Sequence, residues 1–309
     1  MTSSKDPEAK AQLCGRLGGG LGVGVGVDMG ATLAKIAIRE SSKGSGNEPS
    51  PETRFELLPA GELHTIVQRV EEVAPVSVGL TGGGAVQLAE RLPCSADRVN
   101  EFAAWGTGAA RLMEGQEMNP QEPYLLVSVG TGTSVLLIDG ISVVRTGGTA
   151  LGGGTLMGLA AALLGKADFE DLCRLAERGR RSAVDLLVSD IYRAGEIPLG
   201  GDITASCFGK LALTQRGGDG PGCEEASSQD LAAALMGLVG ENVALICGGL
   251  AAAAQVREIV FAGCTLRSNP ALESVIGQVT RALGRRATFL PDGEFAGALG
   301  GLELAQQRS

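Results

Sequence analysis

Two short turns rich in glycine and threonine constrain the fold of this chain more than any other feature. The first lies within residues 25–35, VGVDMGATLAK, and the second within residues 125–134, LLVSVGTGTS; each joins two apolar strands. A hairpin needs glycine where φ is positive, but it needs neither a threonine beside each glycine nor an aspartate at the strand exit. Small residues let backbone N–H groups approach an anion, and hydroxyls add further donors. Together the two turns predict a clamp for the phosphates of a nucleotide.

A third glycine cluster strengthens this interpretation. Residues 145–155, RTGGTALGGGT, stand directly before an apolar stretch with helical spacing at 155–164. The N-terminus of a helix carries unpaired N–H groups and the positive end of its dipole, so it suits an anion. The same glycines could instead form a hinge between two lobes, and the two roles are compatible. Neither a GxxxxGK[ST] pattern nor a GxGxxG pattern after a strand occurs in the sequence.

The composition bounds the class of protein. The chain has 309 residues, of which 44% are hydrophobic, enough for one large domain or two lobes with cores of their own. The net charge of −9 argues against a nucleic-acid partner or an anionic membrane surface. No unbroken apolar run reaches the ~18 residues that a bilayer span needs, and the polar, glycine-rich N-terminal segment lacks the apolar core of a signal peptide. These features predict a cytoplasmic protein.

Cysteine and histidine offer little chemistry. The seven cysteines include no CxxC pair, which argues against a disulfide framework or a structural zinc site and predicts reduced thiols. The single histidine, His64, lies in an amphipathic stretch, where a structural role is favoured over a catalytic one.

Hydrophobic periodicity predicts an alternating α/β chain. We expect a flexible tail at 1–22, an N-terminal lobe at 23–120 and a C-terminal lobe at 121–305, with a ligand cleft between the lobes. The expected strands are 23–28, 33–39, 76–80, 258–263 and 287–290, with a second hairpin over 124–145. The expected helices are 62–73, 96–113 with Ser95 as N-cap, 155–164, 169–177, 183–192, 228–254, 270–283 and 295–305. The expected loops are 41–53 and 215–228.

These motifs resemble those of the type II pantothenate kinases, a family of the sugar kinase/actin/heat-shock ATPase superfamily, over residues 23–305. The first phosphate turn of the family corresponds to Asp28-x-Gly30-x-Thr32-Leu33-x-Lys35, where Ala31 replaces a second glycine. The other matching segments, in the order of the family, are 80–83, Glu101-Phe102, 129–134, Arg145 with Gly147-Gly148, 152–154, 201–205, 259–264 and 292–300. The resemblance implies two ribonuclease-H-like α/β lobes around a cleft.

The resemblance also implies roles for individual residues. Asp28 would hold Mg²⁺ through water, and Glu101 would be the catalytic base, although an ordinary exposed helix glutamate is the alternative. Arg145 would bind the substrate carboxylate, and Thr204 the pantothenate chain. ATP would contact the two turns and the helix start at Asp28, Met29, Gly30, Ala31, Thr32, Leu33, Ala34, Lys35, Thr131, Gly132, Thr133, Gly153, Gly154, Thr155, Leu156 and Met157. The adenosine pocket would be lined by Phe169, Gly263 and Cys264, with core packing as the alternative for Phe169.

The resemblance implies ATP-dependent phosphorylation of pantothenate, the first step of coenzyme A synthesis. It further implies a homodimer formed through the helix at 228–254, with coenzyme A or its thioesters as candidate regulators. One alternative is another kinase of the superfamily, acting on a sugar or amino sugar. Against it, Glu101 stands where such kinases commonly use aspartate, and their cysteine-rich zinc motif is absent. The second alternative is a nucleotide-binding regulator without turnover, which the presence of Asp28, Glu101 and Arg145 disfavours.

Overall fold

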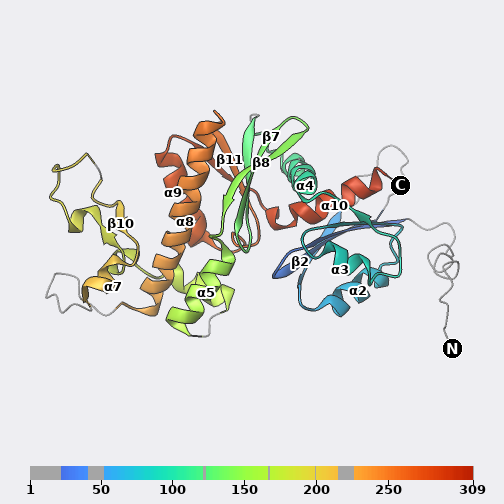
Figure 1. The fold of residues 1–309 in the computed structure, drawn as a ribbon, viewed down its shortest axis with the longest axis horizontal. Helices are drawn as coiled ribbons and strands as arrows, with labels where there is room; N and C mark the ends of the chain where they lie inside the picture. The colour runs from blue at the N-terminus through green and yellow to red at the C-terminus, as the bar shows by residue number, and fades with distance from the viewer. Residues whose placement is uncertain are drawn as a thin grey trace. The chain divides into compact units, whose positions relative to one another are not determined.

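The computed structural model describes residues 22–40, 52–120, 123–165, 168–198, 200–214 and 226–308 (Figure 1). The expected tail at 1–22, except its last residue, and most of the expected loops at 41–53 and 215–228 lie outside the described residues. The chain divides into two compact units. The first holds the described parts of Met1–Glu122, Leu136–Arg145 and Leu290–Ser309, and the second those of Pro123–Val135 and Thr146–Phe289. Segments beyond residue 120 therefore pack with the first unit, and the lobe limits expected from the sequence stay a prediction.

The first unit contains a five-stranded sheet of order β3-β2-β1-β4-β5. Its strands are β1 (Val23–Met29), β2 (Leu33–Glu40), β3 (Thr53–Pro59), β4 (Ser77–Thr81) and β5 (Asp97–Arg98). The first three are antiparallel neighbours, whereas β4 runs parallel to β1 and β5 parallel to β4. The three expected strands of this unit are confirmed to within one residue at each end. The edge strand β3 follows an expected loop and was not predicted.

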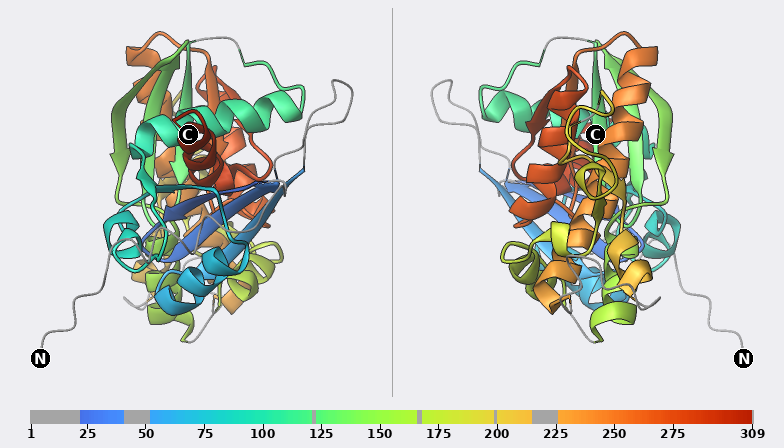
Figure 2. Two further views of the ribbon diagram at one scale, coloured as in Figure 1. Left: turned by 90° about the vertical axis from the view of Figure 1, so that its right-hand side faces the viewer. Right: turned by 90° about the vertical axis from the view of Figure 1, so that its left-hand side faces the viewer.

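The two faces of this sheet carry different residues. The valines of β1, Val25 and Val27, belong to a core with α2 (Leu63–Glu72) and α3 (Ala85–Ala89). The glycines that alternate with them face α10 (Ala296–Gln306), where a Cβ on Gly26 would overlap the carbonyl oxygen of Ala298. Figures 1 and 2 show α2 and α3 on one side of the sheet and α10 on the other. The alternation of valine and glycine therefore lets a helix backbone lie directly on the strands.

Helix α4 (Glu101–Gly115) packs against α10 and begins later than expected. We predicted a helix from residue 96 with Ser95 as N-cap. The N-cap is instead Asn100, whose side chain accepts hydrogen bonds from the N–H groups of Phe102 and Ala103 at 3.0 and 3.1 Å. The correction has a tertiary cause, because the residues before it pair as β5 with the end of β4. The late start makes Glu101 the first residue of the helix.

Close helix packing predicts a stability effect at Gly300 of α10. A Cβ there would overlap the carbonyl of Ala104 in α4, whereas a Cβ on Gly115, at the end of α4, would meet nothing within 4 Å. We expect Gly300→Ala to destabilise the protein by about 1–3 kcal/mol through overpacking. Gly115→Ala is the matched control and is expected to be neutral or stabilising. Urea unfolding of both variants measures the difference, and equal stabilities would contradict the packing argument.

A second five-stranded sheet has the order β12-β11-β6-β7-β8, and its residues outside Leu136–Arg145 belong to the second unit. Its strands are β6 (Tyr124–Val129), β7 (Thr133–Asp139), β8 (Ser142–Thr149), β11 (Glu258–Ala262) and β12 (Arg286–Phe289). Strand β11 runs parallel to both β6 and β12. The expected hairpin over 124–145 is thus three strands, and β8 extends to Thr149. Arg145 and Gly147 therefore lie in a strand and not in a glycine loop.

Helices of the second unit gather around α8 (Ser228–Ala253), which packs against α5 (Gly153–Leu164), α6 (Phe169–Ala176) and α9 (Pro270–Ala282) (Figure 1). These four helices confirm expected ones to within about two residues at each end. Helix α8 is long and apolar enough to cross a membrane by length and composition, although no unbroken apolar run of that length stands in the sequence. Within its most apolar 18-residue window 67% of the residues are buried inside the protein, as in a core helix.

The prediction of a helix at 183–192 is wrong. The structure has two short 3₁₀ turns there, η1 (Arg181–Ala183) and η2 (Val188–Asp190), separated by β9 (Leu186–Leu187), which pairs with β10 (Thr204–Ser206). The cause is again tertiary. Asp185 is fully buried and accepts a hydrogen bond from the Phe208 N–H at 2.9 Å, so the chain is tied to a distant segment instead of coiling on itself.

Candidate active site

Asp28 lies at the end of β1, opposite Lys35 of β2 and beside Thr81 of β4. It is buried, with 3% of its surface exposed. The Lys35 Nζ lies 3.5 Å from the Asp28 Oδ2, and this pair is almost fully enclosed. Burial raises the pKa of Asp28, while the charge and hydrogen bond of Lys35 act in the opposite direction. The turn thus encloses an acidic group and a cation that lie close together.

Glycine backbone surrounds the Asp28 carboxylate on two sides. A Cβ on Gly82, where φ is +84°, would lie 2.5 Å from Oδ1, and one on Gly297 of α10 would lie 2.7 Å from Oδ2. A Cβ on Gly30 would lie 2.9 Å from the Lys35 Nζ. Larger residues at these positions would displace the charged groups, so the carboxylate has room here because these positions are glycine. The turn itself closes through the Gly30 N–H, which donates to the Leu33 carbonyl at 3.2 Å.

Glu101 shares an electrostatic environment with this pair. It is the first residue of α4, and part of its surface is exposed to solvent. Partial burial raises the pKa of Glu101, the charge of Asp28 raises it further, and the charge of Lys35 lowers it. The structure therefore brings three sequence-predicted residues, Asp28, Lys35 and Glu101, into one group. A carboxylate whose pKa is raised by its surroundings is suited to accept a proton near neutral pH.

The second turn lies where two parallel strands of the second unit end. Strand β6 leads into Gly130–Gly132, and β11 leads into Gly263 and Cys264. The Thr265 Oγ1 donates to the Gly130 carbonyl at 2.8 Å and links the two. At the start of α5, the Gly153 N–H donates to the same carbonyl at 2.8 Å, and the Gly154 N–H donates to the Thr131 carbonyl at 2.9 Å. The predicted nucleotide segments at 131–133 and 263–264 and the start of α5 thus lie together where these two inner strands end.

Several predicted phosphate donors are directed at backbone carbonyls in this structure. The Thr133 hydroxyl donates to the Leu151 carbonyl at 2.7 Å, and the Thr155 hydroxyl to the Ala150 carbonyl at 3.1 Å. These bonds, with those of Gly153 and Gly154, hold the turn against the helix start. Their first role is therefore structural, and contact with phosphate stays a prediction for all of them.

The remaining nucleotide residues differ in exposure. Leu156 is fully buried, so its side chain belongs to the core of the unit, whereas Met157 and Phe169 are half-buried. Gly263 has φ +111°, and a Cβ there would lie 2.5 Å from the Val129 carbonyl oxygen. This glycine is required by the close approach of two strand ends, which is independent of any ligand.

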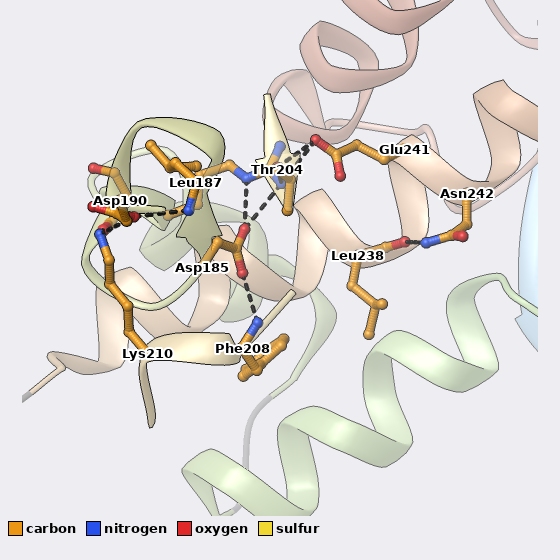
Figure 3. A network of polar contacts seen from close by, with 11 residues as sticks. Asp185, Leu187, Asp190, Thr204, Phe208, Lys210, Leu238, Glu241 and Asn242 are labelled. Carbon is orange, nitrogen blue, oxygen red and sulfur yellow. Dashed lines mark hydrogen bonds and ion pairs between the residues drawn. The ribbon is translucent and has the colours of Figure 1, made fainter. Parts of the chain in front are cut away.

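The two predicted substrate residues have different surroundings. Arg145 is exposed on β8, and no hydrogen bond or ion pair of its side chain is found within the described ranges. Thr204 of β10 is half-buried in a polar cluster with Arg181, Asp185 and Glu241 (Figure 3). Sequence reasoning missed this cluster. Arg181 lies 23 residues before Thr204 in the sequence, and Glu241 lies 37 residues after it. Nothing in the sequence near these residues indicates the contact.

The fold defines the broad class of the protein. It is similar to the solved component A of the (R)-2-hydroxyglutaryl-CoA dehydratase of Acidaminococcus fermentans, with a TM-score of 0.59 and 17% identity over 93% of this chain and 98% of that one. A ROK family glucokinase of Streptomyces griseus, solved with glucose and AMPPNP, gives a TM-score of 0.51 at 17% identity over 93% of this chain and all of that one. These likenesses place the two units in the actin-like ATPase fold.

The sequence comparisons define the family more narrowly. A type II pantothenate kinase of Bacillus anthracis is 32% identical over 280 residues, which cover 90% of this chain and 95% of that protein. The model of the family named Fumble matches residues 58–303. The chain belongs to the Fumble family, that of the type II pantothenate kinases. The family and the fold expected from the sequence are both confirmed.

Proposed function

We propose that this chain transfers the γ-phosphate of ATP to the primary hydroxyl of pantothenate, which is the first step of coenzyme A synthesis. The observation that carries the proposal is the group of Asp28, Lys35 and Glu101, within a chain that matches the Fumble family over residues 58–303. Phosphoryl transfer requires charge neutralisation, positioning and help for the attacking hydroxyl. This group offers a carboxylate for the hydroxyl proton and a cation beside a buried acid.

Glu101 acts as the base in this proposal. It accepts the proton of the primary hydroxyl as the bond to phosphorus forms. The charge of Asp28 raises the proton affinity of Glu101, and the charge of Lys35 opposes that effect. The capped N-terminus of α4 holds the residue in place through the two hydrogen bonds of Asn100.

Asp28 is proposed to hold Mg²⁺ through water. Among the described residues no group of three or more His, Cys, Asp or Glu side chains could hold a metal ion. A single carboxylate still fits this ion, because Mg²⁺ commonly keeps several waters and takes other ligands from substrate phosphates. When bound, the ion neutralises charge on the transferred phosphoryl group. The glycines at 82 and 297 leave room for the carboxylate, and Lys35 adds positive charge beside it.

We expect Asp28→Asn to damage magnesium-dependent catalysis more than pantothenate binding. Asparagine keeps the shape of the side chain but removes its charge. Because the Asp28 charge raises the pKa of Glu101, the variant should also shift the acid limb of the pH–rate profile to lower pH. Magnesium titrations of turnover and calorimetry with pantothenate measure the two effects. An equal loss of pantothenate affinity, or an unmoved acid limb, would contradict the assignment.

The other predicted contacts complete the proposal. ATP phosphates are bound by the turns at 28–35 and 131–133 and by the start of α5 at 153–157, and adenosine by Phe169, Gly263 and Cys264. The exposed Arg145 binds the carboxylate of pantothenate, since a guanidinium matches that group with two parallel hydrogen bonds. Thr204 binds the chain of the same substrate.

We further propose a cytoplasmic homodimer, with coenzyme A or its thioesters as regulators. Support for the dimer comes from α8, where Leu245 is 52% exposed although most of the helix is buried. Light scattering tests it: Leu245→Glu should yield a smaller species than the parent chain.

The proposed activity is tested by ADP release in a coupled assay, with pantothenate compared against a panel of sugars and amino sugars. Phosphorus NMR of the product then identifies the hydroxyl that carries the phosphate. Turnover with pantothenate alone supports the proposal. Turnover with a sugar would instead favour another kinase of the superfamily, and ATP binding without any turnover would favour a regulator.

A further inference from the structure

The polar cluster around Thr204 fixes the direction of its hydrogen bonds. Arg181 of η1 lies on one side of the Thr204 hydroxyl, with its Nη2 at 2.9 Å from Oγ1. Glu241 of α8 lies on another, with its Oε1 at 2.9 Å from the same oxygen. Figure 3 shows Thr204 and Glu241 directed toward each other, with Asp185 nearby.

The chemistry of these partners leaves one arrangement. A guanidinium has donors and no acceptor, so the Thr204 oxygen must accept from Arg181. A carboxylate paired with an arginine has acceptors only, so the Thr204 proton must go to Glu241. A threonine hydroxyl has one proton and two lone pairs. One lone pair of Thr204 therefore remains for a further contact, and no proton does.

Further contacts of Arg181 support this arrangement. The fully buried Asp185 accepts hydrogen bonds from the Arg181 Nε at 3.0 Å and from the Arg181 Nη2 at 2.9 Å. A Cβ on Gly237 would overlap the Arg181 guanidinium, so the helix leaves room for this group only because the residue is glycine. The same Asp185 also accepts from the Phe208 N–H at 2.9 Å, which ties the segment of Asp185 to the residues that follow the strand of Thr204.

We infer that Arg181 and Glu241 are positioning residues that make Thr204 a hydrogen-bond acceptor for its substrate. The inference rests on the proposed function, in which Thr204 contacts pantothenate. Thr204 then selects a donor of the substrate, either the amide N–H or the secondary hydroxyl, and disfavours a carbonyl or carboxylate oxygen at that point. In this geometry the Thr204 hydroxyl can only accept a hydrogen bond from the substrate.

The test compares three substrates: pantothenate, its ester analogue in which oxygen replaces the amide N–H, and its analogue without the secondary hydroxyl. With the parent enzyme, one analogue should lose about three- to tenfold in kcat/KM, as expected for one hydrogen bond. Thr204→Val should raise the KM for pantothenate by a similar factor and show no further loss with that analogue. Thr204→Ser should restore the discrimination. The analogue affected identifies which donor Thr204 binds.

Glu241→Met tests the direction of the bond. It frees the Thr204 proton while Arg181 stays paired with Asp185, so discrimination against the affected analogue should fall although Thr204 is unchanged. Thr288→Val is the matched control, because Thr288 likewise donates to a carboxylate, Glu258 at 2.8 Å, which pairs with Arg286. That variant should keep the parent discrimination. Melting temperatures confirm that each variant is folded.

Two results would overturn the inference without refuting the proposed function. Equal discrimination by the parent and Thr204→Val would show that the hydroxyl does not accept from either donor. Unchanged discrimination in a folded Glu241→Met variant would show that Glu241 does not set the polarity. Failure of the parent enzyme to phosphorylate pantothenate at all would instead refute the proposed function, and the inference with it.

Discussion

Glu101→Gln is expected to lower kcat by about 10²–10⁴-fold, the usual loss when a general base is removed. Glutamine keeps the size of the side chain and its place at the start of α4, since Asn100 still caps the helix. The amide cannot accept the hydroxyl proton in the transition state. The affinity for ATP and the melting temperature should therefore change little. Single-turnover kinetics with pantothenate, together with nucleotide titration, separate these effects.

A matched control for this variant is Glu273→Gln. Glu273 lies in the first turn of α9, and burial raises its pKa as it does for Glu101, but it stands outside the proposed site. The control should keep normal turnover. A kcat close to that of the parent in Glu101→Gln would show that the base lies elsewhere.

The pH dependence of kcat/KM gives a second test of Glu101 as the base. The base must be unprotonated, so kcat/KM should fall as the pH drops through the raised pKa of Glu101, at higher pH than for an ordinary glutamate. Lys35 lowers this pKa, so a Lys35→Met variant should move the acid limb to higher pH. That direction is opposite to the one expected for Asp28→Asn. Shifts of the same sign in both variants would contradict the proposed environment of Glu101.

Arg145→Ala is expected to act through the carboxylate of pantothenate. Loss of a charge-assisted pair in the site costs about 1.5–3 kcal/mol, or roughly ten- to a hundredfold in affinity. Pantothenamides lack that carboxylate, so their penalty should be much smaller. Because Arg145 is exposed, the variant should melt at the temperature of the parent. Calorimetry with pantothenate and one pantothenamide measures the difference.

Arg178→Ala serves as the control, since Arg178 is also an exposed arginine but follows α6, outside the proposed site. It should bind both ligands normally. If a folded Arg145→Ala variant loses both ligands in the same proportion, the guanidinium does not bind the carboxylate. Arg145 would then be assigned to the phosphates of ATP.

Local patterns predicted the elements that local interactions determine. The strands beside the two phosphate turns and the long helix α8 were predictable, because apolar periodicity and glycine placement act over a few residues. The fold class came from the family resemblance. The group of Asp28 and Lys35 was predictable too, since a tight turn sets them opposite each other. The choice of Glu101 as a site residue came from a family resemblance and not from spacing.

Contacts between distant segments were not predictable. The pairing of β5 with β4 moved the start of α4, and the burial of Asp185 replaced an expected helix with two short turns. The partners of Thr204 lie far away along the chain, so the motif at 201–205 identified the threonine and not the groups that orient it. The hydroxyls of Thr133 and Thr155 bind carbonyls that no sequence pattern indicated.

The glycine-lined face of the first sheet has a consequence for the order of folding. The strand β1 is made early in synthesis, yet the helix that covers its glycines, α10, spans residues Ala296–Gln306. Until that helix leaves the ribosome, the sheet has one bare face of backbone, which offers few side chains to pack and a surface for unwanted pairing. The second unit ends at Phe289, so all of its residues are made before α10. We therefore expect it to fold first during translation, and the proposed catalytic group around Asp28 to form last.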